Sequence, residues 1–252
     1  MAQVDDIRQY MPPRDLLKDK VILITGPGGG IGKAVALAAA RLGARLILLG
    51  RTVSHLESLY DEIMAENCPE PAICPMNLSS ATLDDFAQVA DTIMEKYGHL
   101  DGLLHNASIL GERVPMQTCD PMTFMQVMQV NFNAPVFLTQ ALMPALMAAE
   151  SASVVFTTSG VGLKPRAYWG AYALSKYATE GLGYLLADEL ENTSHIRVNL
   201  INPGATRTGM RAAAYPGEDP MTLKTPAEIA NAYLYLLGPE SSGVNGERFN
   251  AQ

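Results

Sequence analysis

Short, uninterrupted apolar segments alternate along this chain with longer segments of helical character, and this alternation leaves few possible folds. Strands covered on both faces are apolar throughout, whereas strands with one exposed face alternate apolar and polar residues. The expected strands span 21–25, 45–50, 72–76, 100–105, 153–158, 196–201 and 247–250, and the expected helices span about 31–43, 54–66, 82–97, 121–149, 170–191 and 226–237. Because parallel strands need helical crossovers, this order predicts a three-layer α/β fold: a doubly wound sheet of about seven parallel strands with helices on both faces.

The length of 252 residues and the lack of a linker-like segment predict one domain over 1–252, with the polar segment 1–19 as an N-terminal arm. A net charge of −8 argues against a nucleic-acid partner, because nucleic-acid-binding surfaces are basic. No apolar segment approaches the ~18 residues of a membrane span, and Cys68, Cys74 and Cys119 form no CxxC pair. We therefore expect a cytoplasmic protein without a membrane span. The histidines and carboxylates show no metal-ligand grouping, so no metal is expected.

A glycine-rich segment, TGPGGGIG at 25–32, follows the first expected strand and opens the first expected helix. One glycine permits a tight turn, a second lets the backbone approach a pyrophosphate, and a third lets the helix pack closely on the strand. Gly26, Gly30 and Gly32 have the spacing for these tasks, and the helix N-terminus adds N–H donors for phosphate. This setting predicts a Rossmann-type dinucleotide site; the alternative is a glycine-rich loop without a ligand.

A second pattern, YALSK at 172–176, places Tyr172 and Lys176 on one face of an expected helix, since positions i and i+4 share a face. A phenol with an ordinary pKa near 10 is a weak base at neutral pH. A nearby cation favours phenolate and lowers that pKa, as general acid–base catalysis requires. Alone, such a pair is usually a surface tyrosine and a solvated lysine, so its meaning depends on the other motifs.

The motifs taken in order resemble those of the short-chain dehydrogenase/reductase family in its compact, single-domain form, over essentially residues 18–250. They are TGPGGGIG, HNAS at 105–108, Asn131 within VNFNA, Ser159 thirteen residues before Tyr172, YALSK and Pro203-Gly204. The resemblance is greatest to bacterial ketoacyl-reductase-like short-chain oxidoreductases. It implies an NADP-dependent enzyme that interconverts a carbonyl and a secondary alcohol on a small-molecule substrate.

The resemblance implies a catalytic set of four residues, Asn131, Ser159, Tyr172 and Lys176. Tyr172 would exchange a proton with the substrate oxygen, and Ser159 would hydrogen-bond the same oxygen. Lys176 would hydrogen-bond the nicotinamide ribose and lower the pKa of Tyr172, while Asn131 would hold a water that links Lys176 to a proton relay. The alternatives are an ordinary strand-end hydroxyl for Ser159 and, for Asn131, an asparagine that satisfies buried backbone in a helix break.

The resemblance also implies the residues of the cofactor site. Asn106 would support this region and contact the adenosine half, and Asn77 stands where an aspartate often contacts adenine. The Pro203-Gly204 turn with Thr206 and Thr208 would bind the carboxamide and a nearby phosphate, although a threonine after a turn is often a local cap. The expected contacts are Gly26, Gly28, Gly30, Ile31, Gly32, Arg51, Asn77, Leu78, Asn106, Ala107, Tyr172, Lys176, Pro203, Gly204, Thr206 and Thr208.

The end of the second expected strand favours NADP(H) over NAD(H). Selection of NAD usually requires a carboxylate there, but RLILLGRT at 45–52 is followed by no acid before Glu57. Arg51 offers a planar fork of donors matched to a 2′-phosphate, and Thr52 could add a hydroxyl. Many NADP-using relatives carry a second basic residue in the glycine loop, where this chain has Gly29, and Arg51 could instead be a solvated charge.

The substrate site is expected in the loops 108–119, 160–171 and 205–224, which follow strands four, five and six. Their larger apolar residues indicate a mainly apolar site: Leu110, Met116, Val161, Leu163, Trp169, Met210 and Tyr215. Arg207 and Arg211 could attract an anionic substrate or carrier such as an acyl thioester, or could be solvated charges.

A homodimer or homotetramer is also expected, because relatives of this kind pair the long helices that correspond to about 121–149 and 170–191. The apolar segments 137–149 and 182–187 are compatible with such an interface, although both could equally cover the sheet.

Two other function classes stay open. One is a catalytically idle NADP(H)-binding regulatory or assembly protein on the same fold, since a fold does not determine a function. The intact set of Ser159, Tyr172 and Lys176 disfavours it, because a protein that only binds needs no proton donor. The other is a methyltransferase, which would leave YALSK and Asn131 unexplained.

Overall fold

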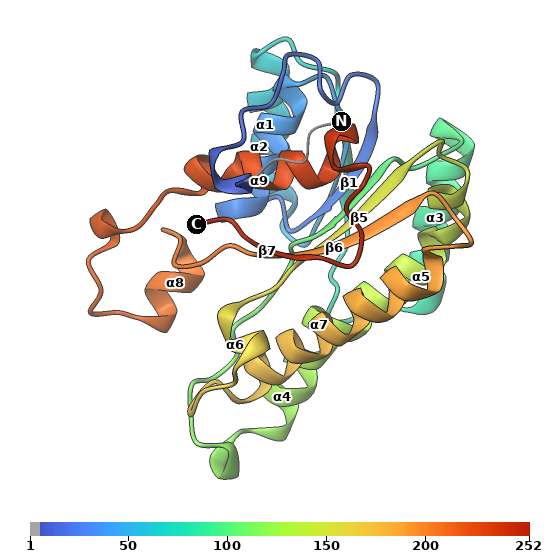
Figure 1. Ribbon diagram of the computed structural model, residues 1–252. Helices are drawn as coiled ribbons and strands as arrows, with labels where there is room; N and C mark the ends of the chain where they lie inside the picture. Colours follow the sequence, from blue (N-terminus) through green and yellow to red (C-terminus); the bar gives the residue numbers. More distant parts are fainter. Residues whose placement is uncertain (1–5) are drawn as a thin grey trace.

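The computed structural model of the protein describes residues 6–252, and one seven-stranded sheet forms its centre (Figure 1). The strands are β1 Val21–Thr25, β2 Arg45–Gly50, β3 Ala72–Pro75, β4 Gly102–His105, β5 Ala152–Thr157, β6 Ile196–Asn202 and β7 Arg248–Asn250. Their order in the sheet is β3-β2-β1-β4-β5-β6-β7, and every neighbouring pair is parallel. The predicted doubly wound parallel sheet is confirmed.

Helices cover both faces of this sheet (Figure 1). They are α1 Gly30–Arg41, α2 Val53–Ala65, α3 Leu83–Tyr97, α4 Pro121–Met128, α5 Ala134–Met147, α6 Gly160–Leu163, α7 Gly170–Leu190, α8 Gly209–Ala214 and α9 Pro226–Leu237. Helices α1, α2 and α9 pack on one face and share a core with β1 and β2. Helices α3, α5 and α7 pack on the other face. Because both faces are covered, all residues of β1 and β5 are buried, which explains the uninterrupted apolar segments.

The predicted helix over 121–149 is wrong in one respect, because the structure divides it into α4, a π-helical turn at Gln129–Asn133 and α5. Asn131 lies in the turn, and its amide is hydrogen-bonded to the backbone of Ile109 on one side and to Ser175 of α7 on the other. A π-helical turn inserts an extra residue into a helix and occurs frequently at functional sites. The turn places the Asn131 side chain between two neighbouring segments.

The N-terminal segment is packed rather than merely extended. Of the predicted arm 1–19, residues 1–5 lie outside the described residues. Beyond them, a 3-10 turn at Ile7–Gln9 lies against α9, and the ring of Tyr10 meets Tyr235 of α9 edge-on with 5.1 Å between centroids. Leu17 is fully buried in the same core. A single domain over 1–252 stays a prediction, which the single sheet supports.

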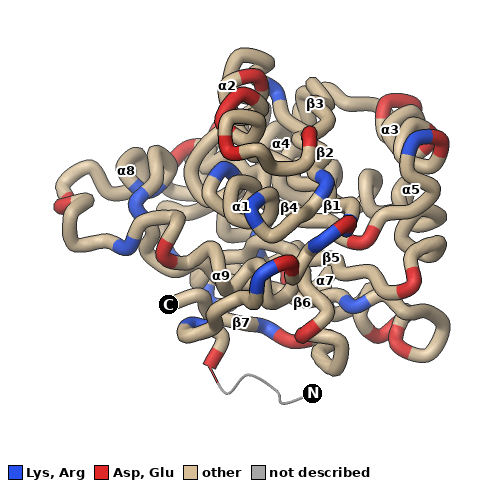
Figure 2. The backbone as a smooth tube through the Cα atoms, turned by 90° about the horizontal axis from the view of Figure 1, so that it is seen from above, with Lys and Arg blue, Asp and Glu red and all other residues tan. Residues whose placement is uncertain are grey.

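Most charged residues lie on the outside of the fold, and the buried ones within residues 6–252 are Asp101, Lys176, Glu180 and Arg197. Figure 2 shows Lys and Arg intermixed with Asp and Glu on the outer helices and loops. In residues 6–252, no helix has the length and apolar character needed to cross a membrane. Over the same range, no group of three or more His, Cys, Asp or Glu side chains is placed to hold a metal ion.

Candidate active site

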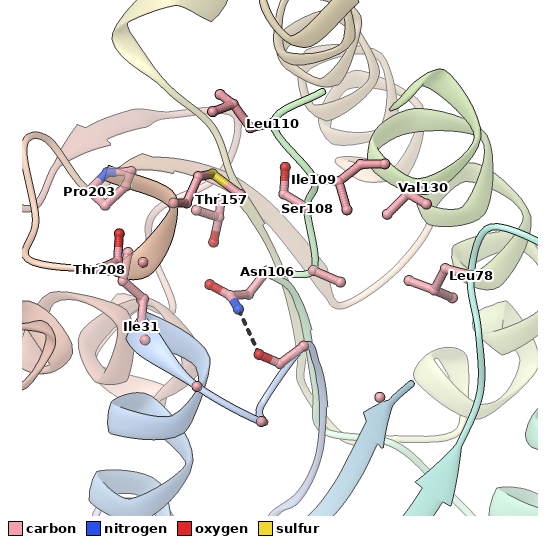
Figure 3. A pocket seen from close by; sticks show the side chains of 18 of the residues that line it. Ile31, Leu78, Asn106, Ser108, Ile109, Leu110, Val130, Thr157, Pro203 and Thr208 are labelled. Carbon is pink, nitrogen blue, oxygen red and sulfur yellow. Dashed lines mark hydrogen bonds between the residues drawn. The ribbon is translucent and has the colours of Figure 1, made fainter. Parts of the chain in front are cut away.

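One cavity of about 510 Å³ lies along the edge of the sheet where the parallel strands end. In Figure 3, Ile31, Pro203 and Thr208 lie on one side of Asn106, and Leu78 and Val130 lie on the other. The predicted site residues that line this cavity are Gly26, Gly28, Gly30, Ile31, Arg51, Asn77, Leu78, Asn106, Ala107, Ser159, Tyr172, Lys176, Pro203, Gly204, Thr206 and Thr208. Gly32 and Asn131 are the predicted residues that do not line it.

The glycine loop turns tightly between β1 and α1, and two of its glycines leave no room for a side chain. Gly26 has φ of +67°, and an added Cβ would lie 2.8 Å from the Cα of Ala107. At Gly32 an added Cβ would lie 2.3 Å from the carbonyl oxygen of Gly26. Gly32 therefore acts from behind the loop by permitting close packing, which explains why it does not line the cavity.

Asn106 supports this loop from the end of β4. Its Nδ2 donates to the carbonyl oxygens of Thr25 and Gly26, each at 3.3 Å. The hydroxyl of Thr25 accepts hydrogen bonds from the backbone N–H groups of Asn106 and Ala107, both at 3.0 Å. The predicted support of this region is visible in these contacts, while a contact between Asn106 and an adenosine stays a prediction.

Tyr172 and Lys176 share the buried face of α7, as the i, i+4 spacing predicts. The Nζ atom of Lys176 lies 5.8 Å from the centroid of the Tyr172 ring and donates to the carbonyl oxygen of Thr157 at 2.8 Å. Burial lowers the pKa of Lys176 to about 8, and the carboxylate of Glu180 acts in the opposite direction. Burial also lowers the pKa of His105 to about 3, so this neighbour of Lys176 is neutral.

The pKa of Tyr172 differs from the sequence-based expectation in this structure. Burial of the phenol raises the pKa to about 12, and a hydrogen bond to Ser159 acts in the opposite direction. The Nζ of Lys176 donates to the backbone of β5, and no hydrogen bond joins it to the phenol oxygen in residues 6–252. The role of Lys176 in lowering this pKa stays a prediction for the enzyme with its cofactor bound.

The contacts of Ser159 and Asn131 match the structural roles that the sequence left open for them, a strand-end hydroxyl and an asparagine that satisfies buried backbone. Ser159 is the N-cap of α6, and its hydroxyl accepts from the N–H of Val161 at 3.4 Å. Asn131 uses both amide hydrogens, one on the carbonyl oxygen of Ile109 at 2.9 Å and one on the hydroxyl of Ser175 at 3.0 Å. Its Oδ1 accepts from the N–H of Ile109 at 2.8 Å, so the side chain joins three segments. A water held by Asn131 stays a prediction.

At the β2 end of the cavity, Arg51 is exposed and forms no ion pair with any of residues 6–252. Asn77 is held by Ser79, whose N–H and hydroxyl donate to its Oδ1 at 3.2 and 2.9 Å. The side chain of His55, on the first turns of α2, packs against Gly28. Sequence reasoning did not single out His55, since a lone histidine near a helix start carries no signal.

At the β6 end, the two predicted threonines have local structural contacts. Thr206 is buried, donates to the carbonyl oxygen of Pro203 at 3.1 Å, and accepts from Gln252 at 3.1 Å. Thr208 is the N-cap of α8, where its hydroxyl accepts from the N–H of Arg211. The local-cap alternative therefore describes Thr208, and contacts of either hydroxyl with a cofactor stay predictions.

The substrate end of the cavity is a small apolar cluster, separate from the two cores of the sheet. It contains Val161, Trp169, Tyr172, Ala173 and Ala214, with Leu110, Met210 and Tyr215 packed against it. Of the predicted pocket residues, Leu110, Trp169 and Met210 line the cavity, and Val161 and Tyr215 lie behind them. Met116 and Leu163 are exposed and lie outside it. These two side chains therefore do not contribute to the apolar lining.

Three arginines join the loops around this cluster. The guanidinium of Arg113 lies 4.6 Å from the ring centroid of Trp169 and 5.1 Å from that of Tyr215, and it donates to the carbonyl oxygen of Ala214. Arg211 forms two hydrogen bonds of 2.6 Å with Glu218. Arg207 donates to the carbonyl oxygens of Pro220, Met221 and Leu223. Arg207 and Arg211 are therefore already used within the protein, which argues against free charges that attract an anionic substrate.

Comparison with known proteins gives close matches over nearly the whole chain. The model of the short chain dehydrogenase family matches residues 20–219. The uncharacterised oxidoreductase YciK of Escherichia coli is 48% identical over 243 residues, which are 96% of this chain and 96% of that protein.

Solved structures match equally well. A short chain dehydrogenase from Pseudomonas syringae is 51% identical with a TM-score of 0.95, and the match covers 97% of this chain and 99% of that chain. A short chain dehydrogenase from Shigella flexneri, crystallised as a complex with NADP, is 47% identical with a TM-score of 0.92. That match covers 95% of this chain and 100% of the other.

Proposed function

Since the chain belongs to the short-chain dehydrogenase family, we propose that it transfers a hydride between NADP(H) and a carbonyl or secondary-alcohol substrate, with Tyr172 as the general acid and base. The observation that carries this proposal is the cavity, because it joins the glycine loop to Tyr172, Ser159 and Lys176 in one space. The family and its named relatives are dehydrogenases and oxidoreductases, so the chain is an enzyme of this class.

The residues present fit a dinucleotide. The cavity begins at the glycine loop, where a Cβ added at Gly26 or Gly32 would collide with neighbouring atoms. It ends at the buried face of α7. Two hydroxyls beside it, those of Ser108 and Thr157, are buried without a hydrogen-bond partner in residues 6–252. The relative from Shigella flexneri was crystallised with NADP, which supports the same cofactor here.

The chain's own residues would orient the substrate and move a proton. When bound, the nicotinamide supplies or accepts the hydride, and the protein supplies orientation and electrostatics. Tyr172 would donate its phenolic proton to the carbonyl oxygen in reduction and accept it in oxidation. Ser159 would donate a hydrogen bond to the same oxygen and hold it near the phenol. Lys176 would hydrogen-bond the ribose and favour the phenolate by its positive charge.

The experiment that tests this function measures NADPH oxidation with a panel of carbonyl compounds. The panel contains neutral alicyclic and aromatic ketones and anionic acyl thioesters. We expect turnover with neutral apolar ketones, because Leu110, Trp169 and Met210 line the substrate end of the cavity and Arg207 and Arg211 are engaged. NADPH binding without turnover on any compound would favour the catalytically idle alternative.

Arg51 is proposed to recognise the 2′-phosphate of NADP. Replacing Arg51 with alanine is expected to raise the Kd for NADP by about 10- to 100-fold, because hydrogen bonds to charged groups contribute about 1.5–3 kcal/mol. The Kd for NAD, which lacks this phosphate, should stay within about twofold. Isothermal titration calorimetry with both dinucleotides measures these changes.

Arg45→Ala is the matched control, because Arg45 is at the other end of β2 and pairs with Asp19. This variant should leave both Kd values unchanged. If the wild type binds NAD as tightly as NADP, or if Arg51→Ala leaves the ratio unchanged, Arg51 does not select the cofactor.

A homodimer or homotetramer through α4, α5 and α7 is proposed from exposed apolar side chains. Those on α7 are Leu174, Tyr177, Tyr184 and Leu185, and those on α4 are Met122 and Met125. The two helices pack side by side, so a partner that covered both would bury these side chains. Light scattering is expected to show at least twice the 27.1 kDa chain mass.

Leu185→Glu should lower that mass to the monomer value, because the carboxylate would be desolvated in the interface. Met64→Glu on α2, which packs on the opposite face of the sheet, is the control and should leave the mass unchanged. A wild type of 27.1 kDa at micromolar concentration would overturn this proposal.

The proposed compartment is the cytoplasm. Cys68, Cys74 and Cys119 are all free thiols, and cysteines stay reduced there. Cell fractionation with an antibody against the chain would test this assignment.

A further inference from the structure

An ion pair between a buried carboxylate and a partly buried guanidinium lies behind the proposed active site and does not line the cavity. Glu180, on α7, is 5% exposed and lies one helical turn after Lys176 and two turns after Tyr172. Its Oε1 accepts from Nε of Arg248 at 2.8 Å and from the hydroxyl of Thr158. Its Oε2 is buried and has no partner in residues 6–252. Arg248 comes from β7, the last strand.

This pair completes a row of contacts along the end of β5. The carbonyl oxygen of Thr157 accepts from Lys176, the hydroxyl of Thr158 donates to Glu180, and the carbonyl oxygen of Ser159 accepts from Nη2 of Arg248 at 3.4 Å. Three consecutive residues are thus held by three charged side chains. Arg248 holds the Ser159 backbone directly, and Glu180 holds it through the neighbouring Thr158.

Stability alone does not account for a buried pair of this kind. Removing two charges from water costs free energy, and well-packed apolar residues of the same volume are often equally or more stabilising. The pair also leaves one carboxylate oxygen without a hydrogen bond, which adds to that cost. A role in holding Thr158 and Ser159 explains why both charges lie beside the end of β5.

We propose that Glu180 and Arg248 are positioning residues for the reaction: the pair fixes Thr158 and Ser159 at the end of β5, and the Glu180 carboxylate keeps Lys176 protonated. The proposal rests on the proposed function, because it gives Ser159 and Lys176 roles in that reaction. Neither Glu180 nor Arg248 touches the cavity, so both act through the residues that do.

The charges around Lys176 indicate in which direction its pKa should change when the Glu180 carboxylate is removed. The titratable groups around Lys176 are His105 on β4, Tyr172 and Glu180 on α7, and Arg248 of β7 on the far side of Glu180. Tyr233 on α9 acts on Tyr172 and Thr157, and the residues of the π-helical turn are uncharged. His105 is neutral, so Glu180 is the anion of this set and acts against the lowering of the Lys176 pKa by burial. Without the carboxylate, Lys176 keeps the burial that lowers its pKa and loses the charge that acts against it. Its pKa must then fall.

The first measurement is a ¹³Cε NMR titration of the lysines in the full chain without cofactor. Lys176 is assigned as the resonance absent from Lys176→Arg. We expect Glu180→Gln to lower the pKa of Lys176 by about one unit or more, a tenfold change in its protonation equilibrium. A shift below about 0.3 units in folded Glu180→Gln would overturn the electrostatic part of the proposal. This result needs no substrate, so it is independent of whether the proposed reaction is found.

The second measurement separates positioning from folding. Because removing both charges of a buried pair is often neutral for stability, Glu180→Gln/Arg248→Met should unfold at a Tm close to that of the wild type. With the most active carbonyl compound of the panel, its kcat should still be at least about tenfold lower, with NADPH Kd within about threefold. Wild-type kcat in this double variant would show that the pair serves only folding.

Thr158→Val tests the contact with β5 alone. It removes the hydroxyl that donates to Glu180 but keeps the shape and the ion pair. We expect a kcat about tenfold lower, an unchanged pKa of Lys176 in the NMR titration, and a shape of the kcat–pH profile like that of the wild type. An unchanged kcat would overturn the placement of Ser159 by this cluster. If no compound turns over with the wild type, the proposed function fails while the NMR result on Lys176 still stands.

Discussion

Replacing Tyr172 with phenylalanine is expected to lower kcat at least about 100-fold while the Kd for NADPH stays within about twofold. The change removes the oxygen that would exchange a proton with the substrate, and general acid–base groups contribute about 10²- to 10⁴-fold. The ring itself stays, so its packing against Trp169, with 5.7 Å between ring centroids, is kept. Steady-state kinetics with the most active carbonyl compound and fluorescence titration with NADPH measure the two quantities.

Tyr177→Phe is the control, because Tyr177 lies on the same helix but is exposed. It should leave kcat unchanged. Lys176→Ala should lower kcat and raise the Kd for NADPH, since Lys176 would hydrogen-bond the ribose and lower the pKa of the phenol. A Tyr172→Phe enzyme that keeps more than about a hundredth of the wild-type kcat would show that another group transfers the proton.

The sheet could be predicted from the sequence because each of its strands carries its own signal. The segment VILIT is buried on both faces in the structure, and its length and composition leave no alternative to a covered strand. The seven strands lie in the order β3-β2-β1-β4-β5-β6-β7, so the chain returns after β3 to pair β4 with the free side of β1. Right-handed crossovers then place the helices before and after this point on opposite faces of the sheet. Each apolar segment forms a strand because helices cover it on both faces of the sheet.

The break in the helix over 121–149 could not be predicted in the same way. No glycine interrupts the segment, and Asn131 contacts Ile109 and Ser175, which lie 22 and 44 residues away in the sequence. The alternative weighed for Asn131 from the sequence, a residue that satisfies buried backbone in a helix break, describes these contacts. Pro135 adds a local cause, because it has no N–H to donate to the carbonyl oxygen of Asn131, which accepts from the hydroxyl of Thr179 instead.

The candidate site could be predicted as a set of residues but not in its electrostatics. The glycine loop and YALSK lie on one cavity because parallel strands end at one edge of the sheet. The direction of the Tyr172 pKa could not be predicted, because it depends on burial in a cluster drawn from three loops. The partner of Arg211 was also missed: Glu218 lies seven residues further, across the turn that follows α8.

Replacing Gly32 with alanine is expected to destabilise the protein by about 3 kcal/mol and to lower Tm by about 6–12 °C. In an exposed helix the same change would stabilise by up to about 1 kcal/mol, so the sign of the effect is the test. The added Cβ would lie 2.3 Å from the carbonyl oxygen of Gly26 and 2.6 Å from Nδ2 of Asn106. Neither can move easily, because Asn106 is bonded to the loop itself and the loop is anchored at both ends by β1 and α1.

Because the clash displaces the loop that would hold the pyrophosphate, the Kd for NADPH should rise more than about tenfold in Gly32→Ala. Gly181→Ala is the matched control, since Gly181 lies inside α7 with no atom within 4 Å of an added Cβ, and it should raise Tm or leave it unchanged. Thermal denaturation and NADPH titration of both variants decide the point. If Gly32→Ala were as stable as the wild type and bound NADPH equally well, helix and strand would not need to pack as closely as the structure has them. The structure would then not require a glycine at position 32.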